Sequence, residues 1–400
     1  MGSMKKQKKA LQICFLILSA ASLLLFWLVP FLGQKDVSET ENRTLARLPA
    51  LSAGSFLSGS FQDDLEKAAG DQLLFSEEVR SFVKGAQASV LTGGQNLLCR
   101  FNPSLRSGYT QITEGYFAYQ GDEHRIVEKL QDYEAGASEA AAFAASFNSL
   151  EGVKRYLYFI NNSRVTDFDR PEDSNRIYDW IRSFFSLDGA ACFASDGYED
   201  YCRWFYQTDH HWNDQGFYRG YTEILNLLKP DETPVGPGDR LETDAVFNGS
   251  YARITKSLRA DEHFVVRSFD LPKYTVTLNG KRGTYGKLKA YLSGRFPSEP
   301  LTNHYANCYG GDYGEIVYDF GTEGRGRLLL IASSYSNPIN ALIASHFDET
   351  RVIDLRYYES YAGQAFDLSA YVKAHDIDTV LLLGDIRLFL PGGDAEGGEA

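Results

Sequence analysis

Histidine and cysteine are both scarce in this chain, which has seven histidines and five cysteines among its 400 residues. The cysteines include no pair with the C-x-x-C spacing of a metal site, so no cysteine-based metal centre is predicted. Cys192 and Cys202 are the nearest pair in sequence, and a disulfide in an oxidising compartment is left open. Basic residues are also few: 40 stand against 53 acidic residues, a formal net charge of −13. Because such a surface repels phosphate backbones, we expect no nucleic-acid partner.

Long hydrophobic runs are limited to one, at residues 11–32. This run contains no charged residue, and as a helix it would span about 33 Å, the thickness of a bilayer core. Lysines precede it within residues 1–10, which predicts a cytoplasmic N-terminus. We therefore predict an uncleaved single-pass transmembrane anchor in the cell membrane, with the rest of the chain extracytoplasmic. A cleaved signal peptide, with its cleavage site in "SAAS" at 19–22, is the alternative.

The chain behind this run divides by composition into three parts. Residues 33–59 are polar and predict an extended linker, residues 60–390 predict a globular domain, and the low-complexity residues 391–400 predict a disordered tail. Within the domain, residues 230–320 carry alternating runs such as "HFVVRSF" and "YTVTLNG", which predict a mostly β insertion. Helical patterns occur over 60–91, 122–149, 174–186 and 213–228, with short strands over 92–121 and 191–195. Asn213 can serve as the N-cap of the last of these helices.

Continuous apolar runs dominate the C-terminal part, at residues 326–334, 350–356 and 379–386. Helical patterns separate them, and a similar buried run lies earlier, at 154–162. Buried strands that alternate with helices indicate a parallel sheet covered on both faces. The sequence therefore predicts an α/β fold with a parallel sheet and flanking helices.

Serines follow the strand expected at 326–334, in the segment "ASSYSNP". Ligands in open α/β sheets bind at the carboxyl ends of strands, and Pro338 suits the first turn of a following helix. Ser333, Ser334 and Ser336 therefore lie where a strand-to-helix turn can supply both a nucleophile and backbone N–H groups for an oxyanion. Ordinary helix N-caps are the alternative interpretation of the same serines.

The loop "TDHHW" places two of the seven histidines side by side. A serine nucleophile needs a base, and the base needs a carboxylate that orients it. Asp209 and His211 are two residues apart, so both can project to one side of an extended turn, with His210 on the other. A zinc site built from Asp209, His210 and His211 and a structural histidine pair are the alternatives. No distant Glu or Cys cluster completes a zinc tetrahedron, so we predict no metal.

The run from Asp209 to Trp212 also resembles the name motif of the DHHW family of bacterial membrane-anchored proteins. Other blocks agree with that family in order: "SETENRTLARLP", "GDQLLFSEEVR", "LLLIASSYSNPINALIASHFDETRVIDLRYY" and "DIDTVLLLG". The resemblance covers most of residues 36–388. The DHHW family is in turn similar to the alginate O-acetylation proteins, which have an SGNH-hydrolase-like domain. The resemblance thus implies an SGNH-hydrolase-like sheet in a permuted order, because the Asp-x-His pair precedes the serine.

The resemblance assigns Ser334 as nucleophile, His211 as base and Asp209 as its partner, with His210 and Trp212 supporting the motif loop. Ser333 stands where the family usually has aspartate. The implied function is O-acetylation of an exopolysaccharide or cell-wall polymer, with acetyl supplied by a multispanning membrane O-acyltransferase partner. No coenzyme A motif is visible, and no cofactor is expected. A carbohydrate acetyl esterase with the same site and a non-catalytic glycan-binding or scaffold subunit of an envelope complex are the alternatives.

Five further residues are candidates for substrate or oxyanion contacts. Tyr335 and Asn337 lie in the serine turn, where they either donate to an oxyanion or make local hydrogen bonds. Arg356 follows the strand expected at 350–356 and either binds substrate or pairs with Asp354. Asn161 and Asn162, at the end of the run 154–162, are expected to line the cleft.

Overall fold

The computed structural model describes residues 37–38, 43–72, 83, 90, 93–94, 97–98, 100–102, 107–130 and 133–390. The predicted cytoplasmic segment 1–10, the anchor 11–32 and the tail 391–400 lie outside these described residues. Within them, no helix has both the length and the apolar character needed to cross a membrane. The chain divides into two compact units, residues 1–87 with 397–400, and residues 88–396.

The described part of the first unit contains two short strands and two helices. Strands β1 (Val37–Ser38) and β2 (Arg43–Thr44) pair antiparallel. Helix α2 (Ala53–Ser58) begins at a capping box in which Ser52 and Ser55 bond reciprocally, and α3 (Ser60–Gln72) follows. The helical expectation for 60–91 is confirmed over α3. The linker expected to be extended contains α2, and α3 belongs to this unit rather than to the globular domain predicted to start at residue 60.

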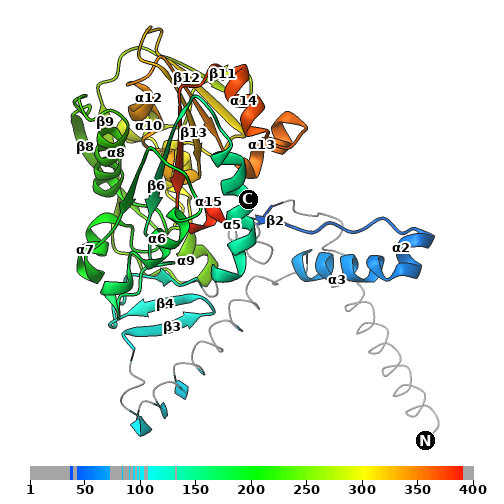
Figure 1. The fold of residues 1–400 in the computed structure, drawn as a ribbon. Helices are drawn as coiled ribbons and strands as arrows, with labels where there is room; N and C mark the ends of the chain where they lie inside the picture. Colours follow the sequence, from blue (N-terminus) through cyan, green and yellow to red (C-terminus); the bar gives the residue numbers. More distant parts are fainter. Residues whose placement is uncertain are drawn as a thin grey trace, which may run out of the picture. The chain divides into compact units, whose positions relative to one another are not determined.

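The second unit is built on an eight-stranded sheet in the order β11-β10-β12-β14-β13-β15-β6-β7 (Figure 1). Five neighbouring strands, from β14 to β7, run parallel to one another. The pairs β14–β12, β12–β10 and β10–β11 are antiparallel. The fold is thus α/β with flanking helices, but the sheet is mixed and not parallel as predicted. The strands are β6 (Lys154–Ile160), β7 (Gly189–Phe193), β10 (Thr275–Leu278), β11 (Lys281–Gly283), β12 (Glu315–Asp319), β13 (Arg327–Ala332), β14 (Glu349–Ile353) and β15 (Thr379–Gly384).

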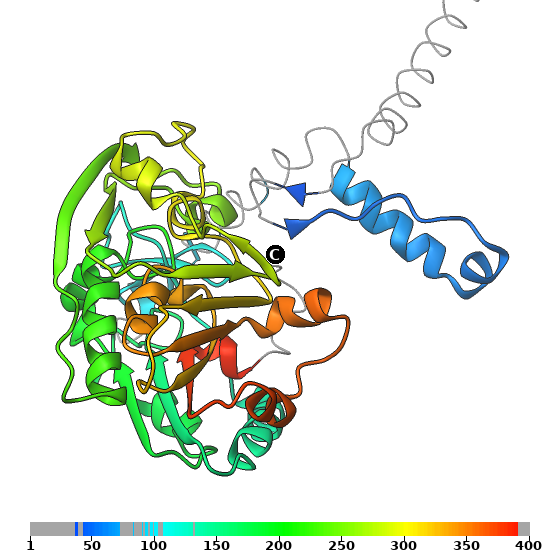
Figure 2. The same ribbon diagram turned by 90° about the horizontal axis from the view of Figure 1, so that it is seen from above.

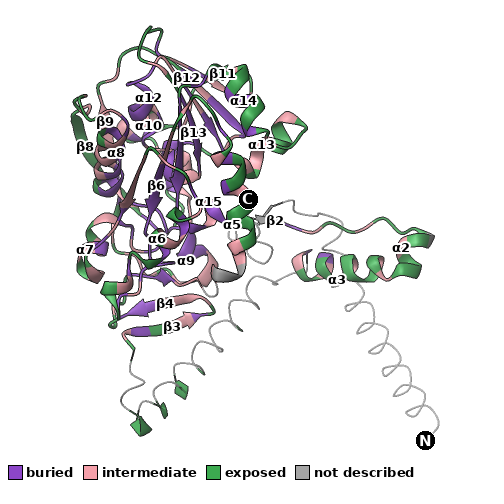
Figure 3. Ribbon diagram, in the orientation of Figure 1, coloured by how far each residue is buried: buried purple, intermediate pink, exposed green. Residues whose placement is uncertain are grey.

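Helices cover both faces of this sheet, because its central strand β13 is apolar and buried from Leu328 to Ala332. Successive residues of β13 enter opposite cores: Leu328 and Leu330 join one cluster, Leu329 and Ile331 the other. Both sets are buried, as Figure 3 shows for the middle of the sheet. The helices on the first face include α8 (Asp214–Leu228) and α12 (Asn340–Ala344), and those on the second include α5 (Ala137–Asn148), α6 (Arg176–Arg182), α14 (Leu368–Ala374) and α15 (Ile386–Phe389) (Figure 2).

The segment 230–320, predicted as a mostly β insertion, is only partly so. Strands β8 (Pro237–Val246) and β9 (His263–Phe269) form a separate antiparallel ribbon, while β10, β11 and β12 extend the main sheet. Three short helices interrupt these strands: α9 (Ser250–Thr255), α10 (Leu288–Leu292) and α11 (His304–Tyr309). The segment is therefore integrated into the main sheet, which explains why that sheet is mixed.

The helix expected over 122–149 begins only at Ala137. Strand β5 (Val127–Glu128) and a 3-10 turn, η2 (Tyr133–Gly136), occupy its first half. Strand β5 pairs with β4 (Tyr116–Tyr119), which pairs with β3 (Tyr109–Thr113). The strands expected over 92–121 are thus present from Tyr109, whereas the described residues between 93 and 101 are helical. Cys192, Cys202 and Cys308 are free thiols, so the pair left open as a disulfide is not bonded. The remaining elements are η3 (Pro171–Asp173), α7 (Gly197–Trp204), η4 (Ser334–Ser336) and α13 (Leu355–Ala362).

Candidate active site

The serine turn lies at the carboxyl end of β13, as the sequence predicts. The apolar strand ends at Ala332, and the chain enters the 3-10 turn η4 at Ser334. The N–H of Ser336 is the first in the turn to bond backward, to the carbonyl of Ser333 at 3.1 Å. The N–H groups of Ser334 and Tyr335 precede that bond, as the first donors of any helical turn do. They are therefore placed to receive an anion at the start of the turn.

The histidine loop joins α7 to α8 on the same edge of the sheet. An isolated bridge between Phe205 and Trp212 closes the loop, and the N–H of Tyr206 donates to the carbonyl of His211 at 3.2 Å. Asn213 caps α8 by accepting from two backbone N–H groups, as predicted from the sequence. Residues 208–212 are all buried, so the histidines lie in the interior and not on a surface turn.

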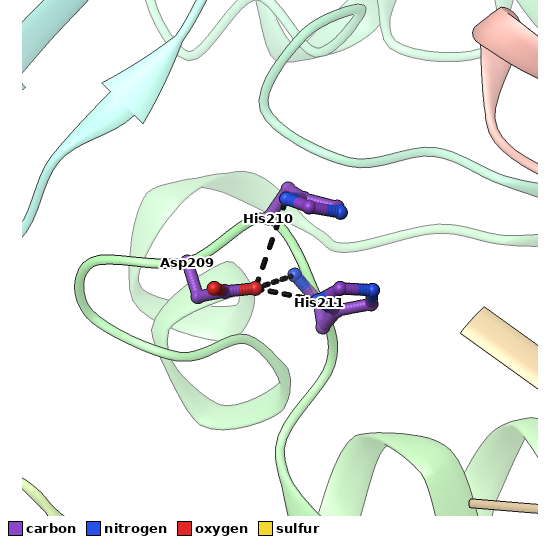
Figure 4. A group of neighbouring side chains, drawn as sticks. All are labelled: Asp209, His210 and His211. Atoms are coloured by element: carbon purple, nitrogen blue, oxygen red, sulfur yellow. Dashed lines mark hydrogen bonds and ion pairs between the residues drawn. The ribbon is translucent and has the colours of Figure 1, made fainter. Parts of the chain in front are cut away.

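The structure brings Ser334, His211 and Asp209 into one hydrogen-bonded row. The Oγ of Ser334 lies 2.7 Å from Nε2 of His211, and Nδ1 of His211 lies 2.6 Å from Oδ1 of Asp209. Figure 4 shows the Asp209 carboxylate pointing at the His211 ring and backbone. Because a carboxylate only accepts hydrogen bonds, Nδ1 carries the proton and Nε2 is left to accept from the Ser334 hydroxyl. This is the geometry of a serine, base and orienting carboxylate.

Asp209 is held as an anion by its neighbours. Burial alone raises the pKa of this carboxyl, but the imidazoles of His211 and His210 and the hydrogen bond from His211 outweigh it, so the pKa lies well below its usual range. Two backbone N–H groups also donate to it, from His211 at 2.9 Å and from Ser250 at 2.7 Å. Gly249 allows that approach, because a Cβ there would lie 2.3 Å from Oδ2 of Asp209.

The zinc alternative rests on the same three residues. Asp209, His210 and His211 each offer one ligand atom, and these atoms lie within 4.8 Å of one another. In the part of the chain that is described, no fourth His, Cys, Asp or Glu joins them. Both carboxylate oxygens accept N–H groups, and Nδ1 of His210 lies 2.9 Å from the hydroxyl of Ser250. The ligand atoms are thus engaged in a hydrogen-bonded arrangement, which favours the triad interpretation over a metal centre.

Tyr335 ties the serine turn to the histidine loop on both sides of His211. Its hydroxyl donates to the carbonyl of His210 at 2.6 Å, and its own carbonyl accepts from the indole of Trp212 at 3.1 Å. Trp212 is fully buried and packs edge-on against the Tyr335 ring. The expectation that the Tyr335 side chain faces an oxyanion is therefore wrong, because its hydroxyl is buried and directed at the loop. Trp212 holds the loop as expected.

A buried polar network lies beneath this contact, and sequence reasoning missed it. Asn162 donates to the Tyr335 hydroxyl at 2.6 Å and to Asp385 at 2.8 Å. Arg164 bridges Asp385 and Glu128. Although burial raises the pKa of Asp385, the charges of Arg164 and Arg387 lower it overall. The asparagine pair after a buried strand was the available signal, but it was interpreted as the lining of a cleft and not as part of a buried network.

Of the other residues predicted to contact substrate, some are buried in structural hydrogen bonds and some remain accessible to solvent. Asn161 is fully buried, where it donates to the carbonyl of Ser174 and accepts from Thr166, so the prediction that it lines a cleft is corrected. Asn337 donates to the carbonyl of Gly310 at 3.1 Å, a bond to a distant segment rather than within the serine turn.

Arg356 pairs with Asp354 at 2.7 Å and with Asp312 at 3.3 Å, while its side chain keeps about a third of its surface exposed. Asn337 also reaches Asp312, at 3.4 Å. The ion-pair expectation for Arg356 is therefore confirmed, and its binding of substrate stays a prediction for a side chain that still faces solvent.

Tyr305, from α11, was also missed by sequence reasoning. Its ring stacks on the His211 imidazole with centroids 3.8 Å apart and planes 15° from parallel. Its hydroxyl donates to the carbonyl of Ser334 at 3.2 Å. The chain has 25 tyrosines, and no sequence motif distinguishes Tyr305 from the others. Its contact with His211 joins residues almost a hundred positions apart.

Comparison with known proteins gives its result through structure. No family model and no curated protein matches the chain. A solved DHHW family protein from Eubacterium siraeum has a TM-score of 0.53 and 17% identity, over 73% of this chain and 96% of that one. PatB1 from Bacillus cereus has a TM-score of 0.49 and 18% identity, over 67% of this chain and 95% of that one. AlgX from Pseudomonas aeruginosa has a TM-score of 0.31 and 12% identity, over 67% of this chain and 63% of that one. The first of these confirms the DHHW resemblance at the level of fold.

Proposed function

We propose that this chain is a serine-dependent O-acetyltransferase that acts outside the cytoplasmic membrane on a polysaccharide or cell-wall polymer. The observation that carries the proposal is the row of Ser334, His211 and Asp209, with successive separations of 2.7 and 2.6 Å at the carboxyl end of β13. A buried carboxylate kept ionised, an imidazole and a half-exposed hydroxyl in this order are what nucleophilic acyl transfer requires.

In the first half of the reaction, His211 removes the hydroxyl proton of Ser334 through Nε2 while Oγ attacks the carbonyl carbon of an acetyl ester. Asp209 holds the Nδ1 proton and stabilises the imidazolium. The carbonyl oxygen becomes an oxyanion, for which the N–H groups of Ser334 and Tyr335 at the start of η4 are the available donors. His211 then gives its proton to the leaving alcohol, and an acetyl ester of Ser334 remains.

In the second half, a hydroxyl of the polymer takes the place of the departed alcohol. His211 accepts its proton, the oxygen attacks the acetyl carbon, and the bond to Ser334 Oγ breaks as His211 returns the proton to the serine. No net proton or electron is consumed. If water enters instead, acetate is released, so an esterase is the same site with a different acceptor.

The polar edge formed by Arg356, Asp312 and Asn337 is the proposed place for the acceptor. These side chains lie beside the serine turn, and Arg356 and Asp312 are joined at 3.3 Å while both stay partly exposed. Donors and acceptors fixed side by side suit the vicinal hydroxyls of a sugar. We propose in addition that the predicted anchor 11–32, which lies outside the described residues, keeps the site near a multispanning membrane O-acyltransferase.

The first experiment tests the row itself. Ser334→Ala and His211→Ala should each lower turnover of an activated acetyl ester by at least about a hundredfold, because base catalysis supplies about 10²–10⁴-fold. Ser333→Ala is the matched control: the Ser333 hydroxyl makes no hydrogen bond in the described part of the chain, so turnover should be retained. A fluorophosphonate probe should label wild type at Ser334 only. Unchanged turnover in both triad variants would refute the assignment.

A second experiment separates the alternatives. The chain is incubated with an acetyl donor and a polysaccharide acceptor, and the products are analysed. Acetate bound to the sugar identifies a transferase, free acetate identifies an esterase, and neither product together with an unlabelled Ser334 identifies a scaffold or glycan-binding subunit.

A further inference from the structure

The His211 ring is covered on one face by an aromatic side chain from a distant segment. Tyr305 lies on α11, and its ring is within 15° of parallel to the imidazole at a centroid separation of 3.8 Å. Tyr335 also contacts His211, but at 5.1 Å and 57° it touches the ring at an angle. The stacked contact with Tyr305 therefore fixes the plane in which the imidazole lies.

The same tyrosine is anchored to the residue that His211 must reach. Its hydroxyl donates to the Ser334 carbonyl at 3.2 Å, so ring and hydroxyl together span base and nucleophile. Tyr305 is almost fully buried, and burial raises the pKa of its hydroxyl well above the usual value. It therefore stays neutral and keeps its proton for that hydrogen bond.

We propose that Tyr305 is a positioning residue for the acyl transfer, which holds the His211 imidazole in the plane that joins Asp209 to Ser334. This inference rests on the proposed function of the same site. The row of three groups is linear only while the imidazole keeps its orientation about the Cβ–Cγ bond. Asp209 fixes one end of the ring through Nδ1, and Tyr305 prevents the ring from tilting about that bond. The aromatic face also favours the imidazolium that forms when Ser334 loses its proton.

The proposal gives the segment 230–320 a specific task. Asp209 accepts a hydrogen bond from the N–H of Ser250, and the ring of Tyr305 stacks on His211. Ser250 and Tyr305 both belong to this segment. The base and its carboxylate are thus each supported from one side by chain that the sequence marks only as an insertion. The segment 230–320 therefore contributes contacts to both His211 and Asp209.

The test compares three variants of the full chain. Tyr305→Phe keeps the ring and loses only the hydroxyl, so kcat on an activated acetyl ester should stay within about threefold. Tyr305→Leu removes the stacked face, and kcat should fall about 10- to 100-fold with KM little changed, because misplacement of a reacting group is felt mainly in the chemical step.

Tyr309→Leu is the matched control. Tyr309 lies one turn later on α11, is also buried, and donates its hydroxyl to a backbone carbonyl, that of Val265, at the same 3.2 Å. It should lose similar stability in thermal unfolding with kcat retained. Equal losses of kcat in Tyr305→Leu and Tyr309→Leu, or an equal loss in Tyr305→Phe, would overturn the proposal by reducing Tyr305 to a packing residue.

A readout independent of catalysis separates this inference from the function on which it rests. In NMR spectra, the ring current of Tyr305 should displace the His211 carbon-bound proton signals upfield in wild type and in Tyr305→Phe, and the displacement should vanish in Tyr305→Leu. If Ser334→Ala shows that the site does no acyl transfer but this pattern is observed, the proposed function fails and the positioning contact stands. If the signals do not move in Tyr305→Leu, the inference fails whatever the activity.

Discussion

Replacement of Asp209 by asparagine changes one atom at the most buried member of the row. The carboxylate accepts three N–H groups: two at Oδ1, from Nδ1 and the backbone of His211, and one at Oδ2, from Ser250. An amide has a single accepting oxygen. Its NH₂ group must therefore face either Ser250, where one hydrogen bond is lost, or His211, where two are lost.

The two orientations bracket the expected effect on catalysis. If the NH₂ group faces Ser250, the imidazole keeps its tautomer and loses only a charged partner, which costs about 1.5–3 kcal/mol, or roughly 10- to 150-fold. If it faces His211, the proton moves to Nε2 and the ring can no longer accept from Ser334, a change that costs about 10⁴-fold in a serine-protease triad. We expect kcat of Asp209→Asn to fall between these limits, with about 1–3 kcal/mol lost in stability for the unpaired donor.

The assay is hydrolysis of an activated acetyl ester, with urea unfolding in parallel. Asp214→Asn is the control, because Asp214 is equally buried five residues later and pairs with Arg240 at 2.9 Å and Arg267 at 2.7 Å. That variant should lose stability with kcat within about threefold of wild type. The reasoning is refuted if folded Asp209→Asn retains more than a tenth of wild-type kcat, or if the two variants lose kcat equally.

Two further predictions concern the support of the histidine loop. Gly249→Ala should lower kcat about a hundredfold, because the new Cβ lies 2.3 Å from Oδ2 of Asp209; Gly236→Ala, with nothing within 4 Å, should leave kcat unchanged in the same ester assay. Burial raises the pKa of Glu262 to about 7, so the stability linked to its bound proton is fully present below about 4.5 and is lost as the pH rises through 7. In urea unfolding, the free energy of unfolding of Glu262→Gln should not show this loss between about pH 4.5 and pH 7. If the variant and the wild type lose the same free energy of unfolding over that interval, the raised pKa of Glu262 is contradicted.

The elements that the sequence predicts best are those whose pattern is local. Strands β13 and β15 are largely apolar runs, because burial on both faces leaves little room for polar residues, whereas β14 is apolar only at its end, Val352–Ile353. The Asn213 cap is equally local. Strand β10 is short and alternates, which shows that it is a strand without showing which sheet it joins, and β11 is exposed at all three of its residues. The mixed sheet was missed for that reason.

The site was predictable where chemistry restricts the residue type and not where packing chooses it. Only a few residue types serve as nucleophile, base and carboxylate, so the motif loop and the serine turn stand out. At the end of β6, both Asn161 and Asn162 were expected to line the cleft, but both are buried: Asn161 donates to the carbonyl of Ser174, and Asn162 contacts Tyr335. Tyr305 depends on how α11 packs, and one sequence carries no signal for such a contact.

The buried network has a physical reason in the order of the strands. Two strands, β15 and β6, separate β13 from β7, so the strand that leads to the histidine loop lies about 14 Å from the one that carries Ser334. The loop must therefore cross the carboxyl ends of both intervening strands. Asn162 follows β6 and Asp385 follows β15, and they bond to each other and, through Tyr335, to the carbonyl of His210.

Each intervening strand thus ends in a polar side chain that supports the loop along its path. An apolar strand end could pack against the loop but could not satisfy the buried carbonyl of His210, which would then lie unpaired at a cost of about 1–3 kcal/mol. Buried ions such as Asp385 and Arg164 are poor sources of stability in themselves, because desolvation offsets their attraction. Their role here is to orient other groups. Through Asn162 they fix the position of the Tyr335 hydroxyl, and that hydroxyl holds the carbonyl of His210, one residue before His211. A base that comes from the far edge of the sheet reaches the nucleophile only because the strands between them provide that path.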